Sequence, residues 1–130
     1  MAADKLISSG GPWESVIGYS RATVAGEYVH VSGSTATVDG ELQCKGDAYG
    51  QTLVALNEVI AKALAQVGYS LADVVRSRVY LANADDMDAV GKAHGEVFGE
   101  IRPAATMLAG IQFINKEMLI EIEVDAWKRA

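Results

Sequence analysis

The sequence predicts an α+β fold in which a mixed β-sheet has two helices on one of its faces. Two helical segments, residues 47–68 and 83–99, alternate with strand-like segments that precede, separate and follow them. The clearest strand is 119–127, where aliphatic and acidic residues alternate strictly. Its aliphatic face needs a covering layer, so we expect both helices on that side of the sheet.

The composition indicates one soluble globular domain spanning residues 1–130. Hydrophobic residues make up 50% of the chain, yet no apolar run approaches the roughly 20 residues of a membrane span. The formal net charge of −6 argues against binding to nucleic acid, which requires a basic surface. The single cysteine, Cys44, cannot form an internal disulfide, and no signal peptide is apparent. We therefore expect a cytoplasmic protein that binds neither membrane nor nucleic acid.

The first 18 residues are expected to be irregular, because Ser8 to Pro12 form a typical loop sequence. Trp13 lies in this segment, and we expect it to dock the segment onto the body of the protein; alternatively it walls a pocket. Two strands follow, 19–24 and 28–32, joined by a hairpin at Gly26. The small residues 32–35 form either a simple turn or a place where a ligand can approach the backbone.

Both helices have recognisable ends. Asp47 is a good N-cap for the first helix and Gly68 ends it, while residues 83–86 cap the second helix and Gly99 ends it. The apolar residues of the first helix recur at helical spacing: Leu53, Leu56, Ile60, Leu64 and Val67. The second helix carries His94 within an apolar stripe, where a histidine is more often half-buried with a hydrogen-bond partner than catalytic.

Two further strands, 74–81 and 104–113, complete the predicted sheet. In the first, one face is expected to hold Val75, Ser77, Val79 and Leu81, and the other Arg76, Arg78 and Tyr80. Before the second, Pro103 should fix a corner and push Arg102 into extended backbone.

The acidic face of the last strand is the most informative polar feature. Glu121, Glu123 and Asp125 repel one another, so this face must be wet, paired with cations or used for chemistry. If strand 74–81 is its neighbour, Arg76 and Arg78 neutralise the row, which is the interpretation we favour. So polar a face does not suit the core of a monomer, but it suits a wet interior between subunits.

Several short segments from about residue 15 to the end form a set with a characteristic order and spacing: Gly18-Tyr19-Ser20, Val31-Ser32-Gly33, Asp47 with Gln51 and Leu56, Asp73-Val74-Val75, Val79-Tyr80-Leu81, Arg102-Pro103-Ala104 and Ile120-Glu121-Ile122-Glu123. Taken together, this set resembles the RidA/YjgF family, whose members deaminate reactive enamines and imines. The resemblance implies a chorismate-mutase-like fold and a homotrimer, in which the sheets form a central barrel and small molecules bind in clefts between subunits.

The resemblance also implies roles for particular residues. Glu121 matches the acidic residue that helps to hold a hydrolytic water, Tyr19 a cleft tyrosine and Gly33 a backbone contact to the ligand. Thr106 agrees with the family's pattern at its position, and His94 falls where many members have tyrosine. Deaminating members have an arginine two places after the proline, which grips the substrate carboxylate; here that position is Ala105. Alanine cannot bind a carboxylate, so we expect altered substrate selectivity.

Three functions are weighed on this basis. The first is hydrolysis of a C=N bond in a small imine or enamine, without metal or cofactor, with Glu121 positioning water and Gly33 and Thr106 orienting the substrate. An anion anchor, if one is needed, would be Arg21 or Arg102, with Arg21 preferred because it follows Tyr19 at strand spacing. The second is a ligand-binding or regulatory trimer without turnover. The third is the ribonuclease or translation-inhibitor activity often attached to the family, which the acidic charge disfavours. The sequence contains no recognisable metal-binding cluster.

Overall fold

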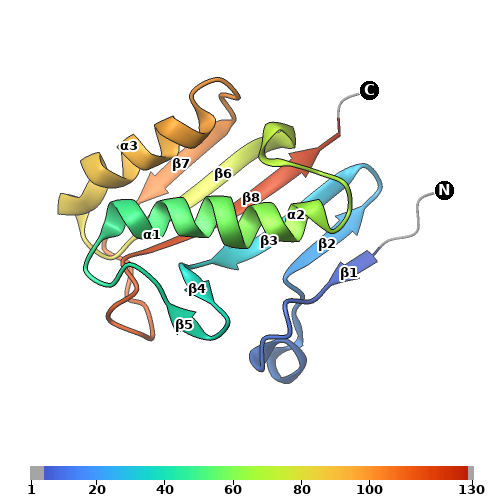
Figure 1. Cartoon of the computed structure of the whole chain (residues 1–130), viewed down its shortest axis with the longest axis horizontal. Helices are drawn as coiled ribbons and strands as arrows, with labels where there is room; N and C mark the ends of the chain where they lie inside the picture. Colours follow the sequence, from blue (N-terminus) through green and yellow to red (C-terminus); the bar gives the residue numbers. More distant parts are fainter. Residues whose placement is uncertain (1–4, 129–130) are drawn as a thin grey trace.

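A computed structural model describes residues 5–128, and a six-stranded sheet of order β1-β2-β3-β8-β6-β7 dominates it (Figure 1). Strands β6 and β7 run parallel, whereas the other neighbouring strands are antiparallel, so the sheet is mixed as predicted. The bounds are Lys5–Ile7 (β1), Ala22–Ala25 (β2), Tyr28–Ser34 (β3), Val74–Leu81 (β6), Ala104–Leu108 (β7) and Ile120–Trp127 (β8). A separate small hairpin pairs Thr37–Val38 (β4) with Glu41–Leu42 (β5).

Both long helices cover the same face of this sheet, which confirms the predicted layering (Figure 1). The first consists of consecutive segments: Ala48–Val54 (α1), a π-helical stretch Ala55–Ile60 and Ala61–Ala65 (α2). Its N-cap is Asp47, whose carboxylate accepts a hydrogen bond of 2.9 Å from the Gly50 amide. The second helix, Met87–Phe98 (α3), ends at Gly99, whose amide donates to the Gly95 carbonyl.

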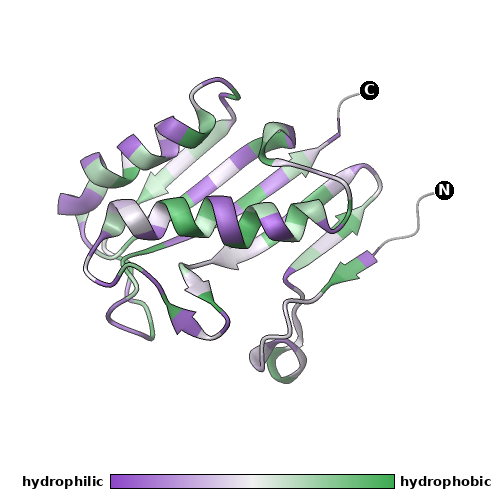
Figure 2. Cartoon of the chain, in the orientation of Figure 1, coloured by the Kyte–Doolittle hydropathy of each residue, from purple (hydrophilic) through white to green (hydrophobic). Residues whose placement is uncertain are grey.

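The core lies between the helices and the aliphatic side of the sheet. On β8, Ile120, Ile122, Val124 and Ala126 are buried, and every second residue between them is only half-buried. From the first helix, Leu56, Ile60 and Leu64 pack against them with no exposed surface. Figure 2 shows hydrophobic and hydrophilic positions alternating along this helix, as expected for one face in contact with a sheet.

A buried glutamine ties the first helix to the start of β8. The Gln51 side chain donates to the Glu117 carbonyl at 3.0 Å and accepts from the Leu119 amide at 2.9 Å. It also donates to the Cys44 carbonyl at 3.3 Å. Because Gln51 has no exposed surface, these bonds satisfy backbone groups that water does not reach.

Several predicted element boundaries are wrong, mostly near the N-terminus. Residues 1–18 are not wholly irregular, because Lys5–Ile7 pairs with β2 and residues 14–18 form a helical turn. A three-residue strand is too short to show a periodic pattern, although Ile7 is buried. Strand β2 begins at Ala22 rather than at residue 19, and β7 ends at Leu108, before Gly110 adopts a φ of 81°.

Two local backbone predictions are also corrected. Val74, not Val75, is buried, because a register break between residues 74 and 76 interrupts the alternation of β6. Arg102 is not extended: its φ is 58°, and its amide donates to the Phe98 carbonyl at 2.8 Å. The left-handed residue closes the C-terminal end of α3, and this capping outweighs the usual preference of a residue before proline.

Trp13 does not dock onto the body of the protein. Its side chain is 62% exposed, and Leu6, Val16 and Ile17 are more exposed still. These large apolar residues form an exposed N-terminal apolar group at the β1 end of the chain. The prediction failed because the described residues of the chain provide no cover for this segment.

We predict that Gln51→Leu lowers the free energy of unfolding by about 2–4 kcal/mol. The change keeps the side chain's approximate size but leaves the buried Glu117 carbonyl and Leu119 amide without their partner. Urea unfolding measures the effect. Gln66→Leu, at an exposed position just after α2, is the matched control and should change stability by less than about 0.5 kcal/mol. Equal stability of the Gln51 variant and the parent would contradict the structural role of Gln51.

Candidate functional site

The sheet face that the helices leave open carries the row of carboxylates on β8. Its flanking strands are β3 and β6, with Glu121 opposite Tyr80, Glu123 opposite Arg78, and Asp125 opposite His30. The predicted pairing of residues 74–81 with 119–127 is therefore confirmed, and cationic side chains lie beside the acidic row.

Glu123 and Asp125 are paired within this face. Arg78 lies 3.6 Å from a Glu123 oxygen and 3.4 Å from an Asp125 oxygen. Tyr80 donates its hydroxyl to Glu123 at 2.7 Å, and His30 Nδ1 lies 2.7 Å from Asp125 Oδ1. Mutual neutralisation thus accounts for two of the three carboxylates. Arg76, although in register with Asp125, is exposed and makes no ion pair among residues 5–128.

Glu121 differs from its two neighbours. Its carboxylate makes no side-chain hydrogen bond or ion pair within residues 5–128, although the residue is half-buried. It lies directly on Gly33: a Cβ added to Gly33 would be 2.8 Å from both Cδ and Oε2 of Glu121. A glycine is therefore required at position 33 for this carboxylate to lie where it does. The requirement is steric and not conformational, since Gly33 has no positive φ.

Gly33 belongs to a β-bulge. The register pairs Val31 with Val124 and next Ser34 with Ile122, so that Ser32 and Gly33 lie opposite the single residue Glu123. A bulge of this kind bends its strand and redirects side chains. Here it brings the Gly33 backbone against the end of the Glu121 side chain.

Arg21, which lies just before β2, holds this bulge in place through hydrogen bonds. Its Nη2 donates to the Gly33 carbonyl at 2.6 Å and to the Ser32 hydroxyl. The Arg21 carbonyl in turn accepts from the Ser32 amide at 3.0 Å and from its hydroxyl at 3.1 Å. The guanidinium is largely buried, and its Nε has no hydrogen-bond partner among the described residues.

The surroundings shift the pKa of the Glu121 carboxyl upwards. Burial is the main cause, since it disfavours the charged form; the Arg21 charge acts in the opposite direction, and Glu123 adds a smaller upward shift. A carboxyl group with a raised pKa holds a proton more readily than an ordinary one and can both accept and return it. Of the three acidic residues, Glu121 therefore has the environment of a general acid–base group.

Tyr19 and Ser32 line a hollow on the open face, next to the bulge. The hollow has a volume of about 500 Å³ and is also lined by Arg78, Glu123 and Asp125. Tyr19 itself is 41% exposed, and the preceding Gly18, with a φ of 89°, turns the chain into position. Glu121 lies against Gly33, Arg21 is bonded to the Gly33 carbonyl, and Tyr19 is close enough to the Arg21 charge to interact with it. We call these four predicted site residues the bulge site. Arg21 also lines a second hollow of about 300 Å³, together with Glu58 and Lys62 of the first helix.

The remaining predicted site residues lie elsewhere. Ala105 and Thr106 are exposed on the edge strand β7, in register with Ser77 and Arg78, so that β6 separates them from β8. His94 lies on the helix-covered side, where its Nε2 is 2.8 Å from the buried Ser77 hydroxyl and its ring is 4.7 Å from that of Phe98. Within one chain, these three residues do not reach the bulge site.

Burial lowers the pKa of His94, which favours the neutral imidazole. A neutral imidazole bonded to a buried hydroxyl matches the expectation of a half-buried histidine with a partner. The alternative anion anchor, Arg102, lies near His94 beside Pro103, around a small hollow of about 230 Å³. It is therefore remote from the bulge site, whereas Arg21 is part of it.

Sequence reasoning missed the bulge and the hydroxyl contacts. The small residues 32–35 were the available signal, because they allowed a close approach to the backbone, but the approaching group is the chain's own Glu121. No cluster of three or more potential metal-ligating side chains occurs within residues 5–128. Over the same range, no helix has the length and apolar character to span a membrane.

Residues 12–128 match the protein-family model described as Endoribonuclease L-PSP. The chain belongs to this family, which is also the RidA/YjgF family. The crystal structure of Rv2704 from Mycobacterium tuberculosis, described as a member of the highly conserved YjgF/YER057c/UK114 family, superposes with a TM-score of 0.86 and 40% identity, covering 97% of this chain and 100% of that chain.

Two relatives of known sequence place the chain further within the RidA/YjgF family. An uncharacterized protein of Streptomyces coelicolor is 41% identical over 128 residues, covering 98% of this chain and 95% of the relative. The 3-aminoacrylate deaminase RutC of Acinetobacter baylyi is 33% identical over 105 residues, covering 80% of this chain and 82% of that protein. The family therefore includes deaminases of small enamines as well as members without an assigned activity.

We predict that Gly33→Ala lowers the pKa of Glu121 towards its ordinary value. The new methyl group would occupy the place of the carboxylate, which must swing towards solvent and lose part of its burial. Carbon-13 NMR of labelled glutamate, with Glu121→Gln used to assign the signal, follows the titration. Because the end of a flexible side chain can move, stability should fall by only about 1 kcal/mol or less.

Gly91→Ala is the control for this substitution. Gly91 lies on the exposed side of α3 with no atom within 4 Å of an added Cβ. It should leave the Glu121 titration unchanged and stabilise the helix by about 0.5–1 kcal/mol. An unchanged titration in Gly33→Ala would show that the Gly33 contact does not determine the position of the carboxyl group.

Proposed function

We propose that this protein is a hydrolytic deaminase of small reactive imines or enamines, acting without a metal or organic cofactor. The observation that carries the proposal is the Glu121 carboxyl group, which is half-buried against Gly33, lacks a hydrogen-bond partner within residues 5–128 and has a raised pKa. Such a group is suited to exchange protons with a bound water. The relationship to the RutC deaminase supports the choice of substrate class.

The reaction needs only water and proton transfers. Glu121 takes a proton from a water molecule while the water oxygen bonds to the carbon of the C=N group, and the nitrogen gains a proton. The resulting carbinolamine collapses to a carbonyl compound as the C–N bond breaks and ammonia or an amine leaves. Gly33 and Thr106 are proposed to orient the substrate, and Tyr19 and His94 to line the cleft. An enamine first takes a proton on carbon to give the iminium ion, the protonated form of the imine, which water attacks in the same way.

We propose that the active form is a homotrimer with its clefts between subunits. The bulge site and the β7 residues Ala105 and Thr106 lie apart in one chain, and a second copy would bring β7 of one subunit to the bulge site of another. Both sheet edges also expose large apolar side chains, with Leu6 on β1 73% exposed and Leu108 on β7 50% exposed. Apolar edges of this kind favour association.

A non-catalytic, ligand-binding trimer is the second candidate. The observation that favours it is Ala105, because a methyl group cannot hold the carboxylate of a 2-imino acid. Ribonuclease activity, despite the family's name, has less support. The two histidines, His30 and His94, lie on the open and the helix-covered side of the sheet respectively, and so do not form an acid–base pair.

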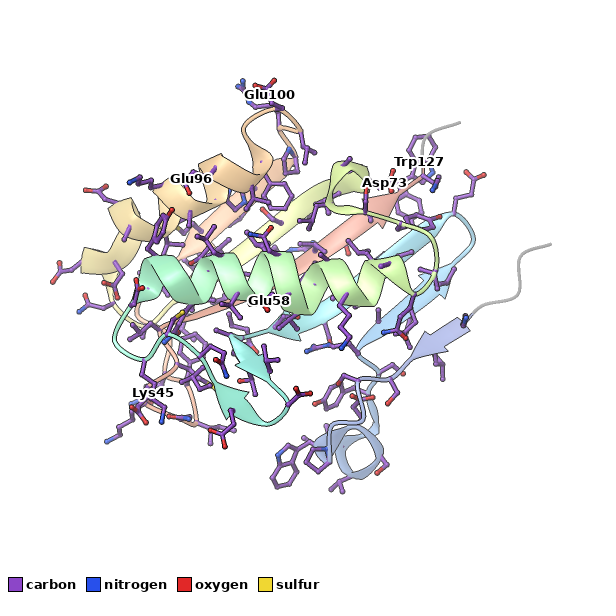
Figure 3. The ribbon with its side chains drawn as sticks, in the orientation of Figure 1. Lys45, Glu58, Asp73, Glu96, Glu100 and Trp127 are labelled. Atoms are coloured by element: carbon purple, nitrogen blue, oxygen red, sulfur yellow. The ribbon has the colours of Figure 1, made fainter. Side chains whose placement is uncertain are left out.

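We predict that Glu121→Gln lowers imine hydrolysis by at least about tenfold with the assembly intact. Glutamine keeps the shape of the side chain but cannot accept the proton. The assay follows the decay of freshly generated imine, trapped at intervals with semicarbazide, at matched trimer concentration established by light scattering. The matched control is Glu100→Gln, an exposed carboxylate that points away from the sheet after α3 (Figure 3). Equal rates for parent and Glu121→Gln would exclude the catalytic role.

We predict that Ala105→Arg raises activity on imines of simple 2-amino acids by about tenfold or more. A bidentate contact between guanidinium and carboxylate contributes roughly 1.5–3 kcal/mol. Residue 105 is exposed on β7, so an arginine fits there without disturbing the core. The comparison is made with parent protein on alanine-derived and serine-derived imines, and on an imine that lacks a carboxylate, whose rate should not increase. No gain in a well-folded trimer would favour the ligand-binding candidate.

A further inference from the structure

Arg21 has an arrangement that the proposed chemistry has not used. It was predicted as an anchor for a substrate carboxylate, yet its Nη2 is already engaged by the Gly33 carbonyl at 2.6 Å and by the Ser32 hydroxyl. Its backbone is fixed as well, through two hydrogen bonds from Ser32 to its carbonyl. A guanidinium held in this way is part of the wall of the bulge site and has little freedom to turn towards a ligand.

Its charge nevertheless has an effect within the site. The Arg21 guanidinium is largely buried, and the acidic and phenolic groups around it are Tyr19, Glu14 and Glu121. Glu14 is itself occupied, since it accepts hydrogen bonds from the Ser9 amide, the Ser9 hydroxyl and the Gly11 amide. Glu121 has no comparable partner within residues 5–128, so the Arg21 charge is its main electrostatic support.

We propose that Arg21 is a positioning residue, which holds the Gly33 bulge under the Glu121 carboxylate and places a positive charge beside it. The proposal rests on the proposed function for its consequence in catalysis, but not for its effect on Glu121. It assigns Arg21 a role opposite to that of a substrate anchor: the guanidinium acts on the protein's own acid and not on the ligand.

The other charged groups around Glu121 cannot take over this role. From β8, Glu123 has the same sign and raises the pKa of Glu121. From β6, Tyr80 is opposite Glu121 in register, but its hydroxyl donates to Glu123 and it carries no positive charge. Another cation of this face, Arg78, is paired with Glu123 and Asp125. If the Arg21 charge is removed, no other positive charge should oppose the effect of burial, which raises the pKa of Glu121.

The sign of the effect follows directly. A nearby positive charge favours the carboxylate, so its loss raises the pH at which Glu121 gives up its proton. If the carboxylate is the base, the acidic side of the pH–rate profile moves to higher pH by the same amount. A residue that only stabilises the fold, or one that only binds substrate, would lower the rate without moving this limb.

The experiment compares Arg21→Gln, Arg21→Lys and the parent. In Arg21→Gln, the NMR titration of Glu121 should move to higher pH. Hydrolysis should fall by about tenfold on the acidic limb of the pH–rate profile but by less than about threefold on its alkaline plateau. Arg21→Lys keeps the charge, so its titration and the midpoint of its pH–rate profile should stay near those of the parent. Arg76→Gln, which removes an exposed and unpaired arginine of the same face, is the control and should change neither.

Each outcome decides the proposal. An unchanged Glu121 titration in a folded Arg21→Gln trimer would overturn it, whatever the activity. Equal loss of rate at all pH values, together with a raised KM for carboxylate-bearing substrates only, would show that Arg21 is a substrate anchor instead. If no variant and no parent hydrolyses any imine, the proposed function fails, but the NMR titration still tests the role of Arg21. Should Arg21→Gln not fold, Arg21→Met, which has a similar reach but no charge, takes its place, and an unchanged Glu121 titration in that variant would equally overturn the proposal.

Discussion

The alternation of β8 is the constraint on which the rest of this structure depends. As a strand in the middle of the sheet, β8 must present Ile120, Ile122 and Val124 to the helices, and the pleat then places Glu121, Glu123 and Asp125 on the other face. Burial of the aliphatic side drives the packing of both helices, while the acidic side must be neutralised by whatever the adjacent strands provide. The aliphatic residues of β8 therefore determine where the acidic residues lie, although they are on the opposite face of the sheet from the site.

The three carboxylates on the open face of β8 differ in environment, because different residues surround each of them. Asp125 meets His30 and Arg78, and Glu123 meets Arg78 and Tyr80, so each carboxylate has partners in direct contact. Glu121 faces a glycine in a bulge and receives only the more distant support of a buried arginine. Environments of this kind separate the acid–base behaviour of chemically similar groups. The difference arises from one extra residue in β3, since without the bulge position 33 would not lie beneath Glu121.

Most of the architecture could be predicted because it depends on periodicity. The strand at 119–127 and the helix after Asp47 have strong patterns, and the pairing of the acidic strand with the basic strand follows from charge. Irregular features could not be predicted, because each depends on tertiary contacts: the bulges at Gly33 and Val75, the short β1 strand, and the left-handed Arg102. For the site, the residue types in the sequence indicated which side chains take part, but not which groups those side chains contact. Arg21 was identified, yet only the structure shows that its guanidinium is engaged by the backbone of the bulge.

The left-handed turn at Arg102 fixes the length of the connection between α3 and β7. The Arg102 amide is tied to the Phe98 carbonyl, Pro103 follows with a fixed φ, and Ala104 already pairs with Arg76 on β6. A strand exchanges its faces when its register moves by one residue. Insertion or deletion of a single residue in this connection would therefore either undo the helix end or exchange the orientations of Ala105 and Thr106. Length variation among related chains should accordingly be absorbed in the loop between β7 and β8, where it leaves that parity intact.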